Sequence, residues 1–212
     1  MSNNEVLVSV IIPTFNSEKF IRRTILSVQA QTLKNWELIC VDDFSTDATR
    51  EILLELAAFD GRIKLFFLEN NSGEPATPKN VGGKHCIGKY IAYLDHDDEW
   101  APEKLAKQVE FIEKNNNIGV VFCNFEARSG NASKAVTLSR CEDVDECILN
   151  YGKYIGNNSC ALISKRTLSL IGERDPEVGA FEDMDMWFRV LRSGYRWDRV
   201  NECLVVVNQH ED

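Results

Sequence analysis

The clearest indication of the fold is the segment Tyr90-Ile91-Ala92-Tyr93-Leu94-Asp95-His96-Asp97-Asp98, an apolar run that ends in an acidic turn. Two earlier segments have the same form. The apolar run from Val6 to Ile12 leads into Pro13-Thr14-Phe15-Asn16, and the run from Trp36 to Val41 leads into Asp42-Asp43. Short apolar runs rich in β-branched and aromatic residues predict buried strands. We therefore expect three strands that each end in a polar turn.

The segments between these runs carry apolar residues at helical spacing. Within residues 20–31, for example, Ile21, Ile25 and Val28 recur at i, i+4 and i+7. Similar patterns predict helices over 52–59, after Pro78, over 102–112 and from Glu182 onward, and further strands over 63–68, 118–125 and 204–207. The alternation indicates an α/β fold with a mainly parallel central sheet flanked by helices. The polar residues 127–141 are predicted to form a loop. The helix from Glu182 is expected to bury the stripe Met184, Trp187, Phe188 and Leu191.

Length and composition narrow the function. A chain of 212 residues suits a single domain. A formal net charge of −9 argues against the basic face that a nucleic-acid-binding protein needs. No apolar run approaches the ~18 residues of a membrane span, and residues 1–5 lack the positive charge of a signal peptide. Seven cysteines without a C-x-x-C pair indicate reduced, mostly buried thiols in a cytoplasmic protein.

The three polar turns are expected to meet, because the carboxyl ends of parallel strands share one edge of the sheet. Asp95 and Asp97 could then both reach one hard cation such as Mg²⁺ or Mn²⁺. A solvated acidic turn that caps the next helix would have the same sequence pattern. Asp42-Asp43 could accept hydrogen bonds from a nucleobase or ribose, or cap the helix that follows. Phe15 could stack on a base, or be a half-buried loop aromatic.

Several familiar catalytic motifs are absent from the sequence. It contains no G-x-G-x-x-G, no G-x-x-x-x-G-K-[ST], no G-x-S-x-G and no H-E-x-x-H. Dinucleotide-binding proteins, P-loop NTPases, serine hydrolases of the α/β type and zinc hydrolases are therefore disfavoured.

Five segments, in this order, resemble the motifs of family 2 glycosyltransferases, which have the GT-A fold. They are Val8–Asn16, Gln31-Thr32 with Trp36–Asp47, Asn71-Ser72-Gly73 with Pro78–Gly82, Gly88–Asp98 and Glu182–Arg189. The resemblance covers nearly the whole chain. It implies an inverting enzyme that moves a sugar from a nucleotide-diphosphate donor, UDP-linked, to an acceptor hydroxyl in polysaccharide or glycoconjugate assembly.

The resemblance also implies a role for each matching residue on the donor side. Pro13, Thr14 and Phe15 are expected to border the nucleobase, and Asp43 to hydrogen-bond it. Lys79 stands where the family has an arginine near the diphosphate. Lysine keeps the charge of that arginine but loses its bidentate fork, so the diphosphate contact is expected to be weaker or different.

The remaining roles concern the metal and the proton. By resemblance, Asp95 reaches the ribose or the metal, and Asp97 binds the Mn²⁺ or Mg²⁺ that bridges the diphosphate. Asp183 matches the general base. An inverting transfer needs one carboxylate to take the proton of the acceptor hydroxyl, and a metal removes the need for an acid on the leaving group. An acid at a helix start is also stabilised by the helix dipole, and both statements can hold for Asp183.

Residues 1–126 are expected to form the nucleotide-sugar-binding half, and residues 127–212 the acceptor half, either shortened or minimal. His210 falls near a position where relatives have a histidine that reaches the metal or the diphosphate. The acceptor is expected to be a sugar or a lipid-linked molecule. A lipid-linked acceptor would bring this cytoplasmic protein into peripheral association with the inner face of the membrane. Two alternative functions are a nucleotidylyltransferase and a non-catalytic nucleotide-sugar-binding domain.

Overall fold

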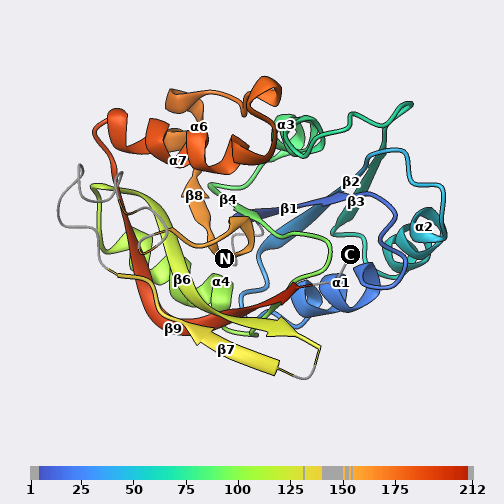
Figure 1. Ribbon diagram of the computed structural model, residues 1–212, viewed down its shortest axis with the longest axis horizontal. Helices are drawn as coiled ribbons and strands as arrows, with labels where there is room; N and C mark the ends of the chain where they lie inside the picture. The colour runs from blue at the N-terminus through green and yellow to red at the C-terminus, as the bar shows by residue number, and fades with distance from the viewer. Residues whose placement is uncertain (1–4, 131, 140–149, 151–152, 154, 210–212) are drawn as a thin grey trace.

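The computed structural model describes residues 5–130, 132–139, 150, 153 and 155–209, and these residues form a sheet with helices on both faces (Figure 1). Its strands are β1 (Val8–Thr14), β2 (Trp36–Asp42), β3 (Ile63–Phe67), β4 (Tyr90–Tyr93), β5 (Glu99–Trp100), β6 (Ile118–Ser129), β7 (Ala132–Val136), β8 (Leu162–Ser164) and β9 (Arg196–Gln209). Its helices are α1 (Ile21–Gln29), α2 (Thr49–Phe59), α3 (Ala76–His85), α4 (Lys104–Glu113), α6 (Lys165–Ile171) and α7 (Glu182–Arg192), with the 3₁₀ turns η2 (Asn158–Cys160) and η3 (Pro176–Phe181).

The parallel half of the sheet has the order β3-β2-β1-β4. Every residue of β1, β2 and β4 is buried, as expected of strands covered by helices on both faces. The chain builds outward from β1 to β3 and then returns to place β4 on the other side of β1. This reversal opens a crevice at the carboxyl ends of β1 and β4, which is where open α/β sheets bind their ligands.

Beyond β4 the sheet is mixed. β8 pairs antiparallel with both β4 and β6, while β9 runs parallel to β6 and antiparallel to the short β5. In the resulting order, β3-β2-β1-β4-β8-β6-β9-β5, the last described strand, β9, lies between β6 and β5, which come from the middle of the sequence. Residues near 100 and residues near 206 are thereby brought to one edge of the sheet.

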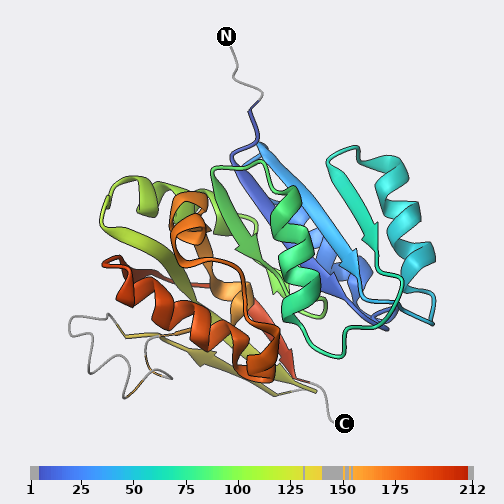
Figure 2. The ribbon, with the colours of Figure 1, turned by 90° about the horizontal axis from the view of Figure 1, so that it is seen from above.

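Helices cover both faces of the sheet. Figure 1 shows α3, α6 and α7 on one face and α1 and α4 on the other, and Figure 2 views the first set from above. The apolar stripe predicted for α1 is confirmed, since Ile21, Ile25 and Val28 are fully buried. α3 lies close against β1 because it has no side chain at Gly82, where a Cβ would lie 2.7 Å from Ile11 Cγ2.

The second half of the chain differs from the sequence prediction in two places. Residues 127–141 were predicted to be a loop, but β6 continues to Ser129 and pairs with β7, with Ser129 opposite Ala132. The hairpin was missed because β7 is mostly exposed and therefore has no apolar alternation. The last strand begins at Arg196 rather than Leu204, because irregular pairing with β6 near Cys123 and Asn124 breaks the period-2 pattern.

Two helices also differ in detail. α3 begins at Ala76, before Pro78, because the Glu74 carboxylate accepts hydrogen bonds from the N–H groups of Ala76 (2.6 Å) and Thr77 (2.9 Å). Pro78 falls in the first turn, where its missing N–H costs nothing. In α7 the predicted Trp187 and Leu191 are buried, but Met186 and Val190 complete the buried face in place of Met184 and Phe188, which are half-buried.

Five of the cysteines lie in the described part of the chain, all of them unpaired and four of them buried, as predicted. Among the described residues, no helix is both long enough and apolar enough to cross a membrane.

Candidate functional site

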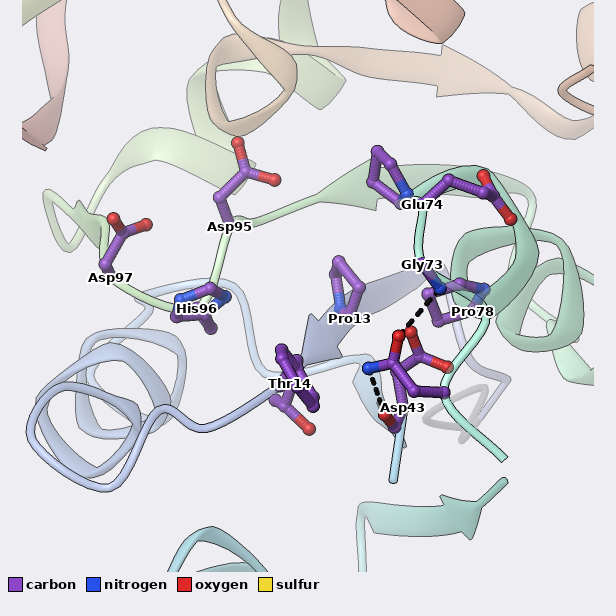
Figure 3. Close-up of a pocket in the computed structure, with 12 residues that line it drawn as sticks. Pro13, Thr14, Asp43, Gly73, Glu74, Pro78, Asp95, His96 and Asp97 are labelled. Atoms are coloured by element: carbon purple, nitrogen blue, oxygen red, sulfur yellow. Dashed lines mark hydrogen bonds between the residues drawn. The ribbon is translucent and has the colours of Figure 1, made fainter. Parts of the chain in front are cut away.

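The three polar turns predicted to meet do so. Thr14 at the end of β1 pairs with Asp42 at the end of β2, and Ile11 of β1 pairs with Tyr93 at the end of β4. A pocket of about 440 Å³ lies over these strand ends. Its wall consists of Pro13, Thr14, Phe15, Asp43, Asn71, Gly73, Glu74, Pro75, Pro78, Asp95, His96 and Asp97. Figure 3 shows Asp95 and Asp97 on one side of this pocket and Asp43, Gly73 and Pro78 on the other.

The sequence left open whether Asp42 and Asp43 cap a helix or bind a ligand, and the structure separates the two residues. Asp42 is fully buried and serves the turn that precedes α2: its carboxylate accepts hydrogen bonds from the N–H and hydroxyl of Ser45 and from Nε of Arg50 (2.6 Å). Asp43 lies on the pocket wall. Of the acidic pair, only Asp43 is in a position to meet a ligand.

The loop after β3 holds Asp43 in place. One carboxylate oxygen of Asp43 accepts from the N–H of Ser72 (2.9 Å), and the other accepts from the Ser72 hydroxyl (2.7 Å). Asn71 donates to the main-chain carbonyl of Asp43 (3.0 Å) and accepts from the N–H of Gly73 (2.7 Å). Gly73 has a φ of +76°, which a residue with a Cβ rarely adopts. The Asn71-Ser72-Gly73 motif thus shapes this end of the pocket.

The opposite end of the pocket is acidic. Asp95, His96 and Asp97 line it, and the neighbouring Asp98 turns away into the protein. The carboxylate of Asp98 accepts from the Ser159 hydroxyl (2.6 Å), from the side chain of Asn157 (3.0 Å) and from the N–H of Asn208 (3.0 Å).

The pKa of Asp98 reports the charge of this end. Burial, together with the negative charges of Asp95 and Asp97, raises it to about 7. Asp95 and Asp97 thus bring negative charge to the acidic end of the pocket, next to the buried Asp98. A divalent cation would relieve that charge, and carboxylate oxygens are the ligands that Mg²⁺ and Mn²⁺ prefer. The residues present therefore fit such an ion.

The residues that the structure describes supply only part of a coordination shell at this end. Among the described residues, no group of three or more histidine, cysteine or acidic side chains is arranged to hold a metal. A cation held by Asp95 and Asp97 would need oxygens from water or from a bound ligand to complete its shell. That requirement suits an ion that arrives with a diphosphate.

Lys79 does not lie on the wall of this pocket. It is 3% exposed, and its Nζ lies 2.7 Å from Oε1 of Glu182 and 3.8 Å from Oδ1 of Asp95. Its ammonium therefore lies behind Asp95 and joins it to the start of α7. A direct contact between Lys79 and a diphosphate remains a prediction.

Asp183 is the second residue of α7, after Glu182, and does not line the pocket either. It is half-buried, and its Oδ1 accepts a hydrogen bond from the N–H of Met184 (2.7 Å). Burial raises its pKa above the ordinary range of an aspartate, and the charge of Glu182 adds to the rise. A raised pKa makes this carboxylate a stronger base. Its catalytic role remains a prediction, and His210 lies outside the described residues.

Sequence reasoning missed the residue that ties these parts together, Arg174. Its guanidinium is buried and contacts the carboxylate of Glu182 and Oδ1 of Asn158, the latter at 2.9 Å. No local pattern marks Arg174, which stands in an irregular, polar stretch before η3. Its partner Glu182 was within reach of sequence reasoning, since it belongs to the Glu182–Arg189 segment.

The profile of the family described as "Glycosyl transferase family 2" matches residues 9–169, about three quarters of the chain. The chain belongs to this family. As a family 2 glycosyltransferase it is an enzyme of sugar transfer, and the family decides against the nucleotidylyltransferase alternative.

Relatives from bacteria agree with this assignment. TuaG of Bacillus subtilis (strain 168), named for teichuronic acid biosynthesis, is 34% identical over 206 residues, which are 96% of this chain and 79% of TuaG. WfgD of Escherichia coli, named as a UDP-Glc:α-D-GlcNAc-diphosphoundecaprenol β-1,3-glucosyltransferase, is 41% identical over 129 residues, which are 61% of this chain and 49% of WfgD. The chain therefore spans most of one relative and about half of the other.

Solved structures confirm the GT-A fold. Residues 1–349 of TarS from S. aureus in complex with UDP superpose with a TM-score of 0.79 at 23% identity, over 96% of this chain and 60% of that one. The mannosyltransferase PcManGT from Pyrobaculum calidifontis, in complex with GDP-Man and Mn²⁺, gives a TM-score of 0.75 at 21% identity, over 97% of this chain and 57% of that one.

Proposed function

We propose that this glycosyltransferase moves a sugar from a UDP-sugar to an acceptor hydroxyl with inversion of the anomeric centre. The observation that carries the proposal is a single pocket with two chemically different ends over the strand ends. One end has apolar walls and one fixed carboxylate, which suits a nucleobase. The other end carries two carboxylates that suit a metal-bound diphosphate.

The donor-binding roles follow from this arrangement. The uracil lies between Pro13 and Phe15, with Thr14 on the floor, and its ring N–H donates to Asp43. The carboxylate oxygens of Asp43 already accept hydrogen bonds from Ser72, so the group is oriented before the donor arrives. Phe15 is 43% exposed, and binding of a base would cover its ring.

The proposed cation is Mn²⁺ or Mg²⁺, held by Asp97 with help from Asp95. When bound, it supplies charge neutralisation on the diphosphate as the sugar leaves. The ammonium of Lys79 lies 3.8 Å from Oδ1 of Asp95 and offsets part of the charge of that carboxylate. Asp95 is then available to the ribose as well.

Asp183 is the proposed general base. It takes the proton of the acceptor hydroxyl while that oxygen attacks the anomeric carbon from the face opposite the diphosphate. Its raised pKa supports the role, since a stronger base accepts the proton more readily. Residues up to 126 thus provide the donor side, and Asp183 acts from the acceptor side.

The acceptor is proposed to be a sugar or a lipid-linked sugar in the assembly of a polysaccharide or glycoconjugate. The names of TuaG and WfgD support this class, and the UDP complex of TarS supports the donor. A lipid-linked acceptor would be met at the inner face of the membrane by an enzyme of the cytoplasm.

Two measurements test the proposal. A panel of nucleotide sugars with Mn²⁺, screened by thermal shift, identifies the donor, because a ligand that binds the native state raises its melting temperature. NMR of the product then reports the anomeric configuration, and a retained configuration would exclude single displacement. UDP binding without turnover on any acceptor would instead favour a non-catalytic binding domain.

A further inference from the structure

We propose that Arg174 is a positioning residue that holds the start of α7, and with it Asp183, in register with the Asp95–Asp98 turn. The inference rests on the proposed function, because it gives Asp183 the role of base. Arg174 is 3% exposed and belongs to none of the five motif segments. It lies between the two parts of the site that must act on one sugar.

On the acceptor side, Arg174 acts through Glu182, the first residue of α7. Its Nη1 donates to Oε2 of Glu182, while Lys79 donates to Oε1 of the same carboxylate at 2.7 Å. Glu182 is 2% exposed and is therefore held from two directions. Because Asp183 is the next residue of the same helix turn, the position of Glu182 fixes the position of the Asp183 backbone.

On the donor side, Arg174 acts through η2. Its Nη2 donates to Oδ1 of Asn158 at 2.9 Å. The next residue, Ser159, has a hydroxyl that accepts from the N–H of Asp95 (3.0 Å) and donates to the carboxylate of Asp98 (2.6 Å). One planar guanidinium thus spans the start of α7 and the turn that carries the pocket aspartates.

The backbone and the ring contacts of Arg174 are equally fixed. The side chain of Asn80 donates to its carbonyl (2.8 Å) and accepts from its N–H (2.9 Å). Its guanidinium carbon lies 4.2 Å from the centre of the Tyr93 ring, on the last residue of β4, and 5.7 Å from that of Trp187. Helix α3, which carries Pro78 and Lys79, and strand β4, which leads into the pocket turn, therefore hold this arginine in one place.

A role in packing alone explains this cluster poorly. Buried ion pairs are costly to desolvate, and apolar side chains of similar volume often stabilise a fold as well or better. The cluster contains two buried cations, Lys79 and Arg174, and one fully buried carboxylate, Glu182, with Asp95 as the nearest second anion. A network of charges that joins Asp95 at the pocket to the start of α7 is better explained by a need to set the relative position of these two parts.

The charges that face Asp183 make the proposal measurable. The charge of Glu182 raises the pKa of Asp183, whereas those of Arg174 and Lys79 lower it, as does the hydrogen bond from the N–H of Met184. Removing the charge of Arg174 should therefore move the acid limb of the pH–rate profile to higher pH. A lysine at position 174 would restore the positive charge without the bidentate guanidinium. It should therefore return the acid limb to its wild-type pH but not restore the position of Asp183.

The test compares Arg174→Met, Arg174→Lys and Arg189→Met in the full chain. Arg189 is the matched control: it also ties α7 to the preceding segment, through the carbonyls of Ile171 (2.7 Å) and Glu173 (2.9 Å), but it pairs with Asp185 rather than Glu182. For each variant, kcat per folded molecule, donor KM and the pH profile of kcat are measured with the donor and acceptor that the wild type uses.

In Arg174→Met, kcat should fall about 10²-fold, the loss expected of a misplacement near 1 Å, with donor KM little changed and the acid limb at higher pH. Arg174→Lys should recover part of kcat and the wild-type limb, and Arg189→Met should keep both. Wild-type kcat and limb in Arg174→Met would overturn the proposal. If that variant does not fold, wild-type kcat in Arg174→Lys overturns it, because lysine cannot bridge Glu182 and Asn158. Failure of the proposed function is distinct, since the wild type itself would then transfer no sugar.

Discussion

Replacing Asp183 by asparagine should separate chemistry from binding and from folding. Asparagine keeps the size of the side chain and its Oδ1, which accepts the hydrogen bond from the N–H of Met184 at 2.7 Å. The substitution removes one negative charge from the first turn of α7, an interaction typically worth about 0.3–1 kcal/mol. It also removes a carboxylate whose raised pKa shows that its ionised form is disfavoured where it lies. These two effects oppose each other, so the stability of the fold should change by less than about 1 kcal/mol.

The expected effect on catalysis is several times larger. Loss of a general base lowers the rate by about 10²–10⁴-fold, which corresponds to about 3–5 kcal/mol of activation free energy. Donor affinity should stay near that of the wild type, because Asp183 does not line the pocket that receives the donor. The variant is thus expected to fold and to bind UDP while turning over very slowly.

The assay pairs titration calorimetry of UDP with Mn²⁺ against a measurement of UDP release in the presence of acceptor. Asp185→Asn is the matched control, since Asp185 lies two residues further along the same helix and pairs with Arg189 at 2.8 Å. It should lose at most about 0.5 kcal/mol of stability and no activity. Turnover near that of the wild type in Asp183→Asn would refute the reasoning, because the proposed proton acceptor would then be dispensable.

Three further measurements test the proposed metal site, the packing of α3 against β1, and the pH dependence of the proposed base. Asp97→Asn should weaken UDP binding measured by calorimetry with Mn²⁺ and change it little with EDTA. The control Asp60→Asn, at the end of α2, should leave the UDP affinity unchanged under both conditions. If the UDP affinity depended neither on the metal nor on the Asp97 substitution, Asp97 would not belong to the site. Gly82→Ala should destabilise the fold by about 1–3 kcal/mol, since its Cβ would lie 2.7 Å from Ile11 Cγ2. Gly83→Ala, whose Cβ would have nothing within 4 Å, should stabilise the helix by up to about 1 kcal/mol. If both variants shifted the denaturant midpoint in the same direction, this packing would be contradicted. The kcat of the wild type should fall with decreasing pH through the pKa of Asp183, and because that pKa is raised, the fall should begin at a higher pH than for an ordinary aspartate; an acid limb at or below the ordinary aspartate range would contradict this.

The parallel half of the fold could be read from the sequence because its signals are local. β1, β2 and β4 are covered on both faces, so each appears as an unbroken apolar run, and each run ends in a polar turn. Parallel pairing then brings the carboxyl ends of the strands together whatever the detailed packing. This logic led directly to the pocket and to seven of its wall residues, which are Pro13, Thr14, Phe15, Asp43, Asp95, His96 and Asp97.

The mixed half could not be read in this way. β9 pairs with β6 through register shifts, and the exposed β7 shows no alternation, so neither strand carries a clean period of two. Their partners are also distant in the chain: Phe125 pairs with Val205, and Glu99 with Val206. Nothing in the local sequence of a strand states which distant strand completes it.

The amino-acid pattern identified which residues are chemically able to act, and the packing of the fold determines which of them lie together. Asp42 and Asp43 cannot be told apart in the sequence. In the structure, however, the carboxylate of Asp42 is hydrogen-bonded within the turn before α2, whereas Asp43 lies on the pocket wall. Lys79 could be identified as a cation, but only the fold pairs it with Glu182, 103 residues away, and brings Arg174 to the same carboxylate. The physical reason is that strand and helix propensities act over a few residues, whereas the partner of a buried charge is set by the packing of whole elements.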